Sequence, residues 1–139
     1  MLTLLRVLSK FDGVLRQFLV DDKGGVAIIA FGYPNFSHED DASRAVQAAI
    51  EIHKDLKNVH NVSNSIGITT GICFVGTVGS STRYEYAMVG DVVNLSARLM
   101  VAARNSESDF PILIDHATAF LAPHLHFLKL KPIKVKVAT

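Results

Sequence analysis

Hydrophobic and polar residues follow two different periods along this chain, and each change of period predicts a change of element. Over residues 39–57 apolar positions return every three or four residues, which predicts an amphipathic helix with acidic residues first and lysines last. Residues 26–31 are apolar without a break, and such a run predicts a central strand buried on both faces. Residues 14–20 are its predicted partner strand, joined to it by a tight turn at 21–25.

The remaining segments extend this alternation. The opening residues fit the last turns of a helix that ends at Gly13, and residues 65–75 and 84–89 are predicted to form a second hairpin. Because the strands are mostly antiparallel and the helices fall on one face, the predicted class is α+β, an α/β sandwich. Ser37 and Asp40 are expected to form a capping box at the start of the helix over residues 39–57. The other expected elements are a helix from Asp91, a strand at 111–114, a helix capped by Asp115 and strands around 124–127 and 132–139.

One stretch, residues 84–100, combines a predicted strand, a turn at Gly90 and a helix that is apolar nearly all round, with Asp91 as its expected N-cap. Asp91, Asn94 and Arg98 lie at positions i, i+3 and i+7, on one stripe of that helix. A buried stripe of this kind needs a partner, and an anion such as phosphate suits a helix N-terminus. The alternative is purely structural: a cap, a backbone hydrogen bond and an ordinary ion pair. The pattern by itself favours the structural alternative.

Composition narrows the function classes. The 139 residues make one domain or a piece of one, and 49% hydrophobic residues are enough for a sizeable core. A net charge of +1 offers no basic field for nucleic acid. Cys73 is the one cysteine, which excludes an internal disulfide and favours a buried, inert thiol. No apolar run reaches membrane-spanning length, and His53 and His60 are predicted on the surface.

Two pairs of residues are candidate metal ligands by residue type. Asp21 and Asp22 in the first turn are better explained as solvated turn residues, because a hard cation needs more oxygen ligands. His124 and His126 alternate along a predicted strand, but no third ligand is close in sequence. We therefore expect no metal site from these residues.

Four segments of the chain resemble the catalytic domain of class III nucleotidyl cyclases, most closely the second cyclase homology domain of soluble adenylyl cyclases. The most specific is the pattern G-D-x-V-N-L-x-A-R at residues 90–98. The resemblance reverses the preference for a structural role of Asn94 and Arg98, and it implies that residues 1–139 are a cyclase domain truncated at both ends. The four segments are residues 11–34, 38–53, 65–100 and 126–136.

In that family two homologous domains pair head to tail and bind a nucleoside triphosphate between them. The resemblance implies that Asn94 orients the ribose, that Arg98 neutralises phosphate charge, and that Asp91 lies beside the nucleotide. The base-reading lysine and its partner acid of the family fall near Gln17 and Ala87 here, so ATP and GTP both stay open. These five residues are the predicted nucleotide-binding set.

The other half of the family's site holds two metal ions on two aspartates. This chain lacks the strand that carries the first aspartate and has Gly24 and Gly25 where the second is expected. The resemblance therefore implies that Mg²⁺ or Mn²⁺ is held by a partner domain and that this chain has no metal site.

The implied function is half of a cytoplasmic adenylyl cyclase core, which makes 3′,5′-cyclic AMP and pyrophosphate from ATP only when paired. The alternatives are guanylyl cyclase specificity and a non-catalytic module that dimerises with an active partner. A third alternative is that the fragment does not fold alone, since its sheet lacks a strand.

Overall fold

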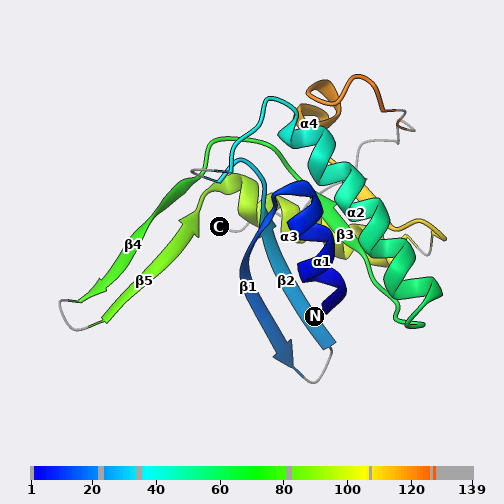
Figure 1. Cartoon of the computed structure of the whole chain (residues 1–139), viewed down its shortest axis with the longest axis horizontal. Helices are drawn as coiled ribbons and strands as arrows, with labels where there is room; N and C mark the ends of the chain where they lie inside the picture. The colour runs from blue at the N-terminus through cyan, green and yellow to red at the C-terminus, as the bar shows by residue number, and fades with distance from the viewer. Residues whose placement is uncertain are drawn as a thin grey trace.

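A computed structural model describes residues 2–21, 24–33, 36–80, 83–106, 108–125 and 127, with the backbone alone at residues 21, 74–80 and 83–89. Antiparallel hairpins stand between the helices along the described chain, which fits the class α+β, and the sandwich predicted from the sequence is confirmed (Figure 1). The elements are α1 Leu2–Phe11, β1 Val14–Asp21, β2 Gly24–Ala30, α2 Asp41–Asn58, β3 Ile66–Ile68, β4 Phe74–Ser80, β5 Arg83–Val89, α3 Asp91–Asn105, β6 Ile112–Ile114 and α4 His116–Phe120.

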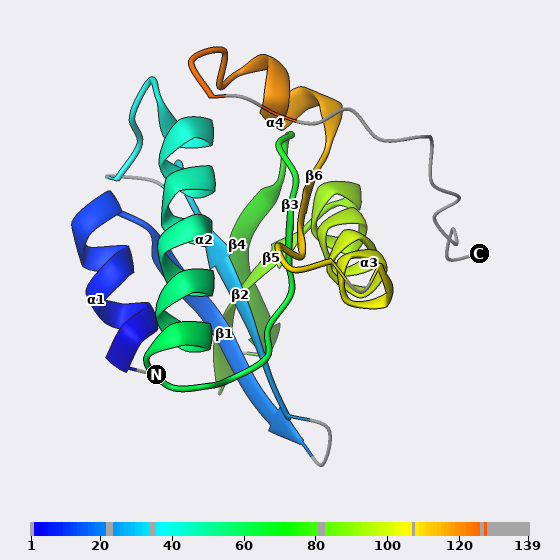
Figure 2. The ribbon, with the colours of Figure 1, turned by 90° about the vertical axis from the view of Figure 1, so that its right-hand side faces the viewer.

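Three strand pairs make up the described sheets. β1 and β2 are antiparallel, and β4 and β5 form a second antiparallel hairpin that reaches away from the other elements (Figure 1). β3 and β6 are parallel, with Ile66 opposite Ile112 and Ile68 opposite Ile114. In Figure 2, β3 and β6 lie between α2 and α3, so the helix that carries the candidate site is supported by this parallel pair.

The main core lies where α1 and α2 pack together against β2. Leu4 and Val7 of α1 meet Ala48 and Ile52 of α2 in a buried cluster, which alternate residues of β2 help to cover. Burial of β2 on both faces was predicted and is wrong for this chain: Val26 is 40% exposed, and the rest of the strand is at best half-buried. The reason is that, in the described part of the chain, β2 pairs with β1 alone and packs by one face.

The strand predicted to lead into the second hairpin is interrupted in the structure. Residues 65–75 were predicted as one strand, but β3 ends at Ile68 and β4 begins at Phe74. The intervening groups are committed elsewhere: the Thr69 hydroxyl donates to the carbonyl of Val92, and the Thr70 N–H donates to Asp115. Such side-chain bonds compete with a strand ladder, so the pairing stops there.

Helix ends follow local hydrogen bonding rather than the predicted cap residues. α1 ends as expected before Gly13, and Asp12 takes the left-handed conformation (φ 60°) while the Gly13 N–H bonds the Leu8 carbonyl at 3.0 Å. The capping box predicted between Ser37 and Asp40 is wrong: Asp40 is itself the N-cap of α2, no side chain caps the helix, and Asp41 accepts the His38 N–H at 3.0 Å.

The final part of the chain is described only in places. The N-cap role of Asp115 is confirmed, since its carboxylate accepts the Thr118 N–H. His124 lies in a turn rather than the predicted strand, because the Leu125 N–H bonds the Ala122 carbonyl at 3.2 Å. His126 and the strand predicted at 132–139 lie outside the described residues.

His53 was predicted on the surface, and this is wrong: the residue is only 3% exposed. Its Nδ1 lies 2.7 Å from Asn64 Oδ1, and its Nε2 lies 3.3 Å from the Asp109 carbonyl oxygen. The ring meets Phe110 edge to face, with centroids 5.1 Å apart. These partners connect α2 with the segments before β3 and β6, so His53 joins the helical layer to the parallel pair. His60, also predicted on the surface, is exposed.

Replacing His53 by phenylalanine should lower the free energy of unfolding by about 1–3 kcal/mol, the usual cost of a buried polar group left unpaired. The ring volume stays, but Asn64 Oδ1 loses its donor, whereas Lys57 Nζ still lies 3.4 Å from the Asp109 carbonyl. Urea denaturation of the variant measures the loss. His124→Phe, at an exposed histidine with no described side-chain hydrogen bond, is the matched control and should change little; equal stability of both variants would contradict the assignment.

Candidate functional site

The strand–turn–helix order predicted at residues 84–100 is confirmed: β5 ends at Val89 and α3 begins at Asp91. The N-cap is Gly90 rather than Asp91, and no side chain caps the helix. Gly90 is extended (φ 164°), and a Cβ there would lie 3.3 Å from the Ile72 carbonyl oxygen. Because Ile72 approaches so closely, the cap position favours a residue without a side chain. Asp91 follows it in the first turn of α3 and is exposed.

α3 is buried along one side only, which corrects the prediction that most of it is buried. Leu99 and Ala103 are buried, and β3 and β6 lie against this helix. Val101 and the stripe residues Asp91 and Asn94 are exposed instead. The helix thus has more nonpolar surface than the described elements packed against it bury.

Arg98 is half-buried on the same stripe, and its environment is unusual. Its Nη1 atom is buried and has no hydrogen-bond partner, and no described carboxylate forms an ion pair with it. Buried guanidinium groups normally have acceptors, because an unmet N–H is costly. The side chain of Asn94, one helical turn earlier, makes no hydrogen bond with a described residue. The backbone hydrogen bond and the ion pair that would give these two side chains a purely structural role are therefore absent from the part of the chain that is described.

The two predicted base-reading positions lie on different hairpins. Gln17 is exposed on β1, opposite Ile28 and directly after a bulge at Arg16. Ala87 is on β5, opposite Gly76, and its backbone alone is described. With Asn94 on α3, the predicted nucleotide-binding set is spread over β1, β5 and α3.

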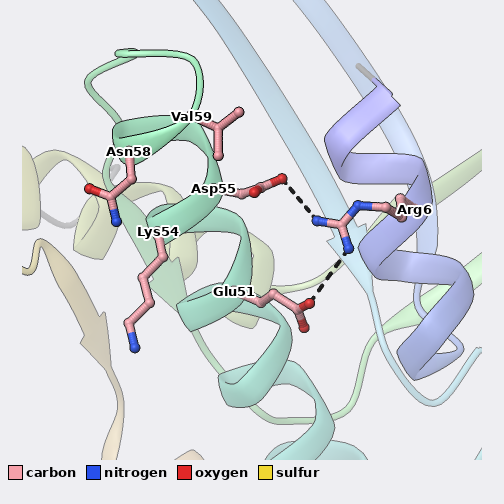
Figure 3. Close-up of a pocket in the computed structure, with 6 residues that line it drawn as sticks. All are labelled: Arg6, Glu51, Lys54, Asp55, Asn58 and Val59. Carbon is pink, nitrogen blue, oxygen red and sulfur yellow. Dashed lines mark hydrogen bonds and ion pairs between the residues drawn. The ribbon is translucent and has the colours of Figure 1, made fainter.

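A hollow of about 500 Å³ lies elsewhere, between α1 and α2 (Figure 3). Both of its acidic side chains already pair with Arg6: Arg6 Nη2 lies 2.8 Å from Asp55 Oδ2, and Arg6 Nη1 lies 3.6 Å from Glu51 Oε1. The hydrogen bond to Asp55 raises the pKa of the Arg6 guanidinium above its ordinary value. Because Arg6 is engaged by these acids and no residue of α3 lies in the wall, this hollow is not the candidate nucleotide site. It is lined by Arg6, Glu51, Lys54, Asp55, Asn58 and Val59.

The described residues of this chain do not fit a metal pair. Within the described ranges no three His, Cys, Asp or Glu side chains gather closely enough to hold a metal ion. Gly24 and Gly25, at the start of β2, have no side-chain ligand to offer. Asp22, one of the two acidic candidate ligands in the first turn, lies outside the described residues.

Comparison with known proteins agrees with this description. Residues 3–136 match the family model for the adenylate and guanylate cyclase catalytic domain. The human protein named adenylate cyclase type 10 is 36% identical over 96 residues, which cover 68% of this chain and 6% of that protein. An uncharacterised protein of Mycobacterium tuberculosis is 33% identical over 97 residues, 69% of this chain and 16% of its own length. The chain thus spans a small part of the curated relatives it matches.

Solved structures show the same fold. The adenylyl cyclase CyaB from P. aeruginosa is 29% identical, with a TM-score of 0.67, over 88% of this chain and 64% of that chain. A guanylyl cyclase, also 29% identical, has a TM-score of 0.58 over 86% of this chain and 60% of its own. None of the helices described in this chain is both long and apolar enough to cross a bilayer. The chain belongs to the class III family of adenylate and guanylate cyclase catalytic domains.

Proposed function

We propose that this chain supplies one half of a nucleotidyl cyclase active site, which a second, homologous domain completes. The observation that carries the proposal is Arg98: a buried guanidinium nitrogen has no acceptor among the described residues, and Asn94 beside it is exposed. Both belong to the pattern at residues 90–98 that specifies the family. An acceptor supplied by a bound triphosphate would meet the unmet donor.

The proposed reaction is ring closure of a nucleoside triphosphate. The ribose 3′-hydroxyl gives up its proton to water and its oxygen attacks the α-phosphorus in line. The bond from the α-phosphorus to the oxygen that bridges it to the β-phosphorus breaks, and pyrophosphate leaves with that electron pair. Arg98 would bind phosphate oxygens on which negative charge grows, and so lower the barrier more than it strengthens ground-state binding. Asn94 would hold the ribose so that the 3′-oxygen faces the phosphorus. The start of α3 adds a partial positive charge near this position.

We propose ATP as the substrate, because the curated relatives at 35–36% identity are named adenylate cyclases. GTP is the second candidate, because a guanylyl cyclase and an adenylyl cyclase are equally identical to this chain. The family's divalent metals, Mg²⁺ or Mn²⁺, would be bound by the partner domain, since the described donors of this chain do not fit them.

A non-catalytic module that stabilises an active partner is the alternative function. Ala87 has no side-chain group that could read a base, and Gly24 and Gly25 have none that could hold a metal. Nucleotide binding by the assembled pair separates the two functions. Affinity that Asn94→Ala abolishes would support the catalytic half-site, whereas affinity unchanged by that substitution would support the non-catalytic module.

Mixing this chain with a class III domain that carries both metal aspartates tests the proposed function. The partner's own arginine is first replaced by alanine, so that it is inactive alone. With Mn²⁺ and either ATP or GTP, we expect cyclic nucleotide from the mixture and none from this chain by itself. Turnover by this chain alone would show that it has a complete site, and no turnover by any mixture would contradict the half-site.

A further inference from the structure

The last two residues of β3 and the first part of the segment that follows run along α3 in the opposite direction, and we call these residues, 67–72, the strap. Its start contacts the middle of α3, because a Cβ at Gly67 would lie 2.5 Å from the Met100 nitrogen. Its end reaches the helix N-terminus, where the Ile72 carbonyl oxygen approaches Gly90. The strap therefore borders α3 from its third turn to its cap.

Thr69 makes the one described side-chain hydrogen bond between the strap and α3. Its hydroxyl donates to the carbonyl oxygen of Val92 at 2.6 Å. Val92 is the second residue of α3, two positions before Asn94 and six before Arg98. Two residues further along the strap, Gly71 packs so closely on the Val92 side chain that a Cβ at Gly71 would overlap it. Val92 is thus held through both its backbone and its side chain.

The neighbouring residue, Thr70, anchors the strap on the other side. Its hydroxyl lies 2.7 Å from Thr118 Oγ1, and Thr118 is fully buried. Because Thr118 donates its own hydrogen to Asp115 Oδ1 at 2.5 Å, Thr70 is the donor in the first of these bonds. The Thr70 N–H also points to Asp115 Oδ2 at 3.4 Å, and the Asp115 N–H bonds the Ile68 carbonyl at 3.1 Å. The cap of α4 therefore fixes the strap to the parallel pair.

We propose that Thr69 is a positioning residue, which sets the place of the first turns of α3 and thereby of Asn94 and Arg98. The inference rests on the proposed function. Its physical basis is that two adjacent side chains bond different elements: Thr70 fixes the strap to the buried hydroxyl of Thr118, and Thr69 connects the strap to α3. A helix that is otherwise buried along one side only has few other contacts to fix its N-terminal turn.

Thr69→Val keeps the shape of the side chain and removes the hydroxyl. In the active mixture, kcat should fall roughly 10-fold to 100-fold, the scale expected when reacting groups are misplaced by about an ångström. KM should change little, because no contact with the nucleotide is removed. Thr69→Ser restores the donor and should recover most of kcat. The matched control is Thr3→Val, which removes a buried hydroxyl bonded to His60 on the other layer, far from α3 in sequence.

The proposal is overturned if Thr69→Val has the kcat of the wild type, if Thr69→Ser is equally impaired, or if Thr3→Val loses as much. Hydrogen exchange supplies a readout that needs no catalysis. Amides in the first turns of α3 should exchange faster in Thr69→Val, and those of α1 and α2 should not; unchanged exchange in α3 overturns the proposal as well. Arg98→Ala, run beside these variants, separates the two hypotheses: full turnover there contradicts the proposed function, while exchange still decides the role of Thr69.

Discussion

Replacing Arg98 by alanine should lower kcat of the active mixture by about 10²–10³-fold, the usual cost of removing one preorganised donor from developing negative charge. The expectation follows from the unmet Nη1 donor and from the absence of a described carboxylate partner. An arginine that acts mainly on the transition state should change kcat more than KM. Steady-state kinetics with saturating metal and both nucleotides measures the two constants.

Two further variants show whether the loss belongs to this one guanidinium. Arg104→Ala removes an exposed arginine from the last turn of the same helix and should leave kcat unchanged. Arg98→Lys keeps the charge without the planar fork and should recover only part of the rate. If Arg98→Ala kept wild-type kcat, the proposed role of this residue would be wrong.

Gly67→Ala should be the most destabilising single methyl addition among the described glycines that have ordinary backbone angles. The new Cβ would lie 2.5 Å from the Met100 nitrogen and 2.9 Å from Leu99 Cβ, so the neighbours that must move include the backbone of α3. Overpacking of this kind costs about 1–3 kcal/mol, and more where backbone is involved. Denaturant unfolding measures the loss, and kcat of the mixture should fall as well because α3 is displaced.

Gly25→Ala is the matched control for that substitution. A Cβ at Gly25 would approach Phe18 Cζ at 3.2 Å, which is the far end of a side chain that is itself 37% exposed. The ring can rotate away, so we expect a change of no more than about 0.5 kcal/mol, as at most surface positions. Equal losses from both glycines would mean that α3 is not held at Gly67 in the way described.

The elements that could be predicted from the sequence are those whose signal is local. The amphipathic period of α2 and the first antiparallel hairpin were each visible within a window of about twenty residues, and the structure has them. A second hairpin was also predicted and is present, but its first strand is Phe74–Ser80 rather than residues 65–75. The parallel pairing of β3 with β6 was not predicted, because it joins Ile66 to Ile112 across an intervening hairpin and helix. His53 was misassigned for the same reason, since one of its partners is the carbonyl of Asp109.

Burial was the property that the pattern overstated. The apolar run at residues 26–31 predicted burial on both faces, and the apolar helix at 92–100 predicted burial of most of its surface, yet each is covered on one side only. Period and composition report how much nonpolar surface a segment has, and they do not say which surface covers it. The candidate site itself came from a nine-residue pattern: spacing placed Asp91, Asn94 and Arg98 on one stripe, and the family resemblance supplied their proposed roles.

The central claim is that Asn94 and Arg98 act on a triphosphate bound against a second domain. A crystal structure of the assembled pair with an ATP analogue tests it most directly. We predict a phosphate oxygen within about 2.7–3.2 Å of an Arg98 guanidinium nitrogen, and the ribose within reach of Asn94. A nucleotide bound elsewhere, with both side chains bonded inside their own domain, would contradict the claim and leave family membership as shared ancestry alone.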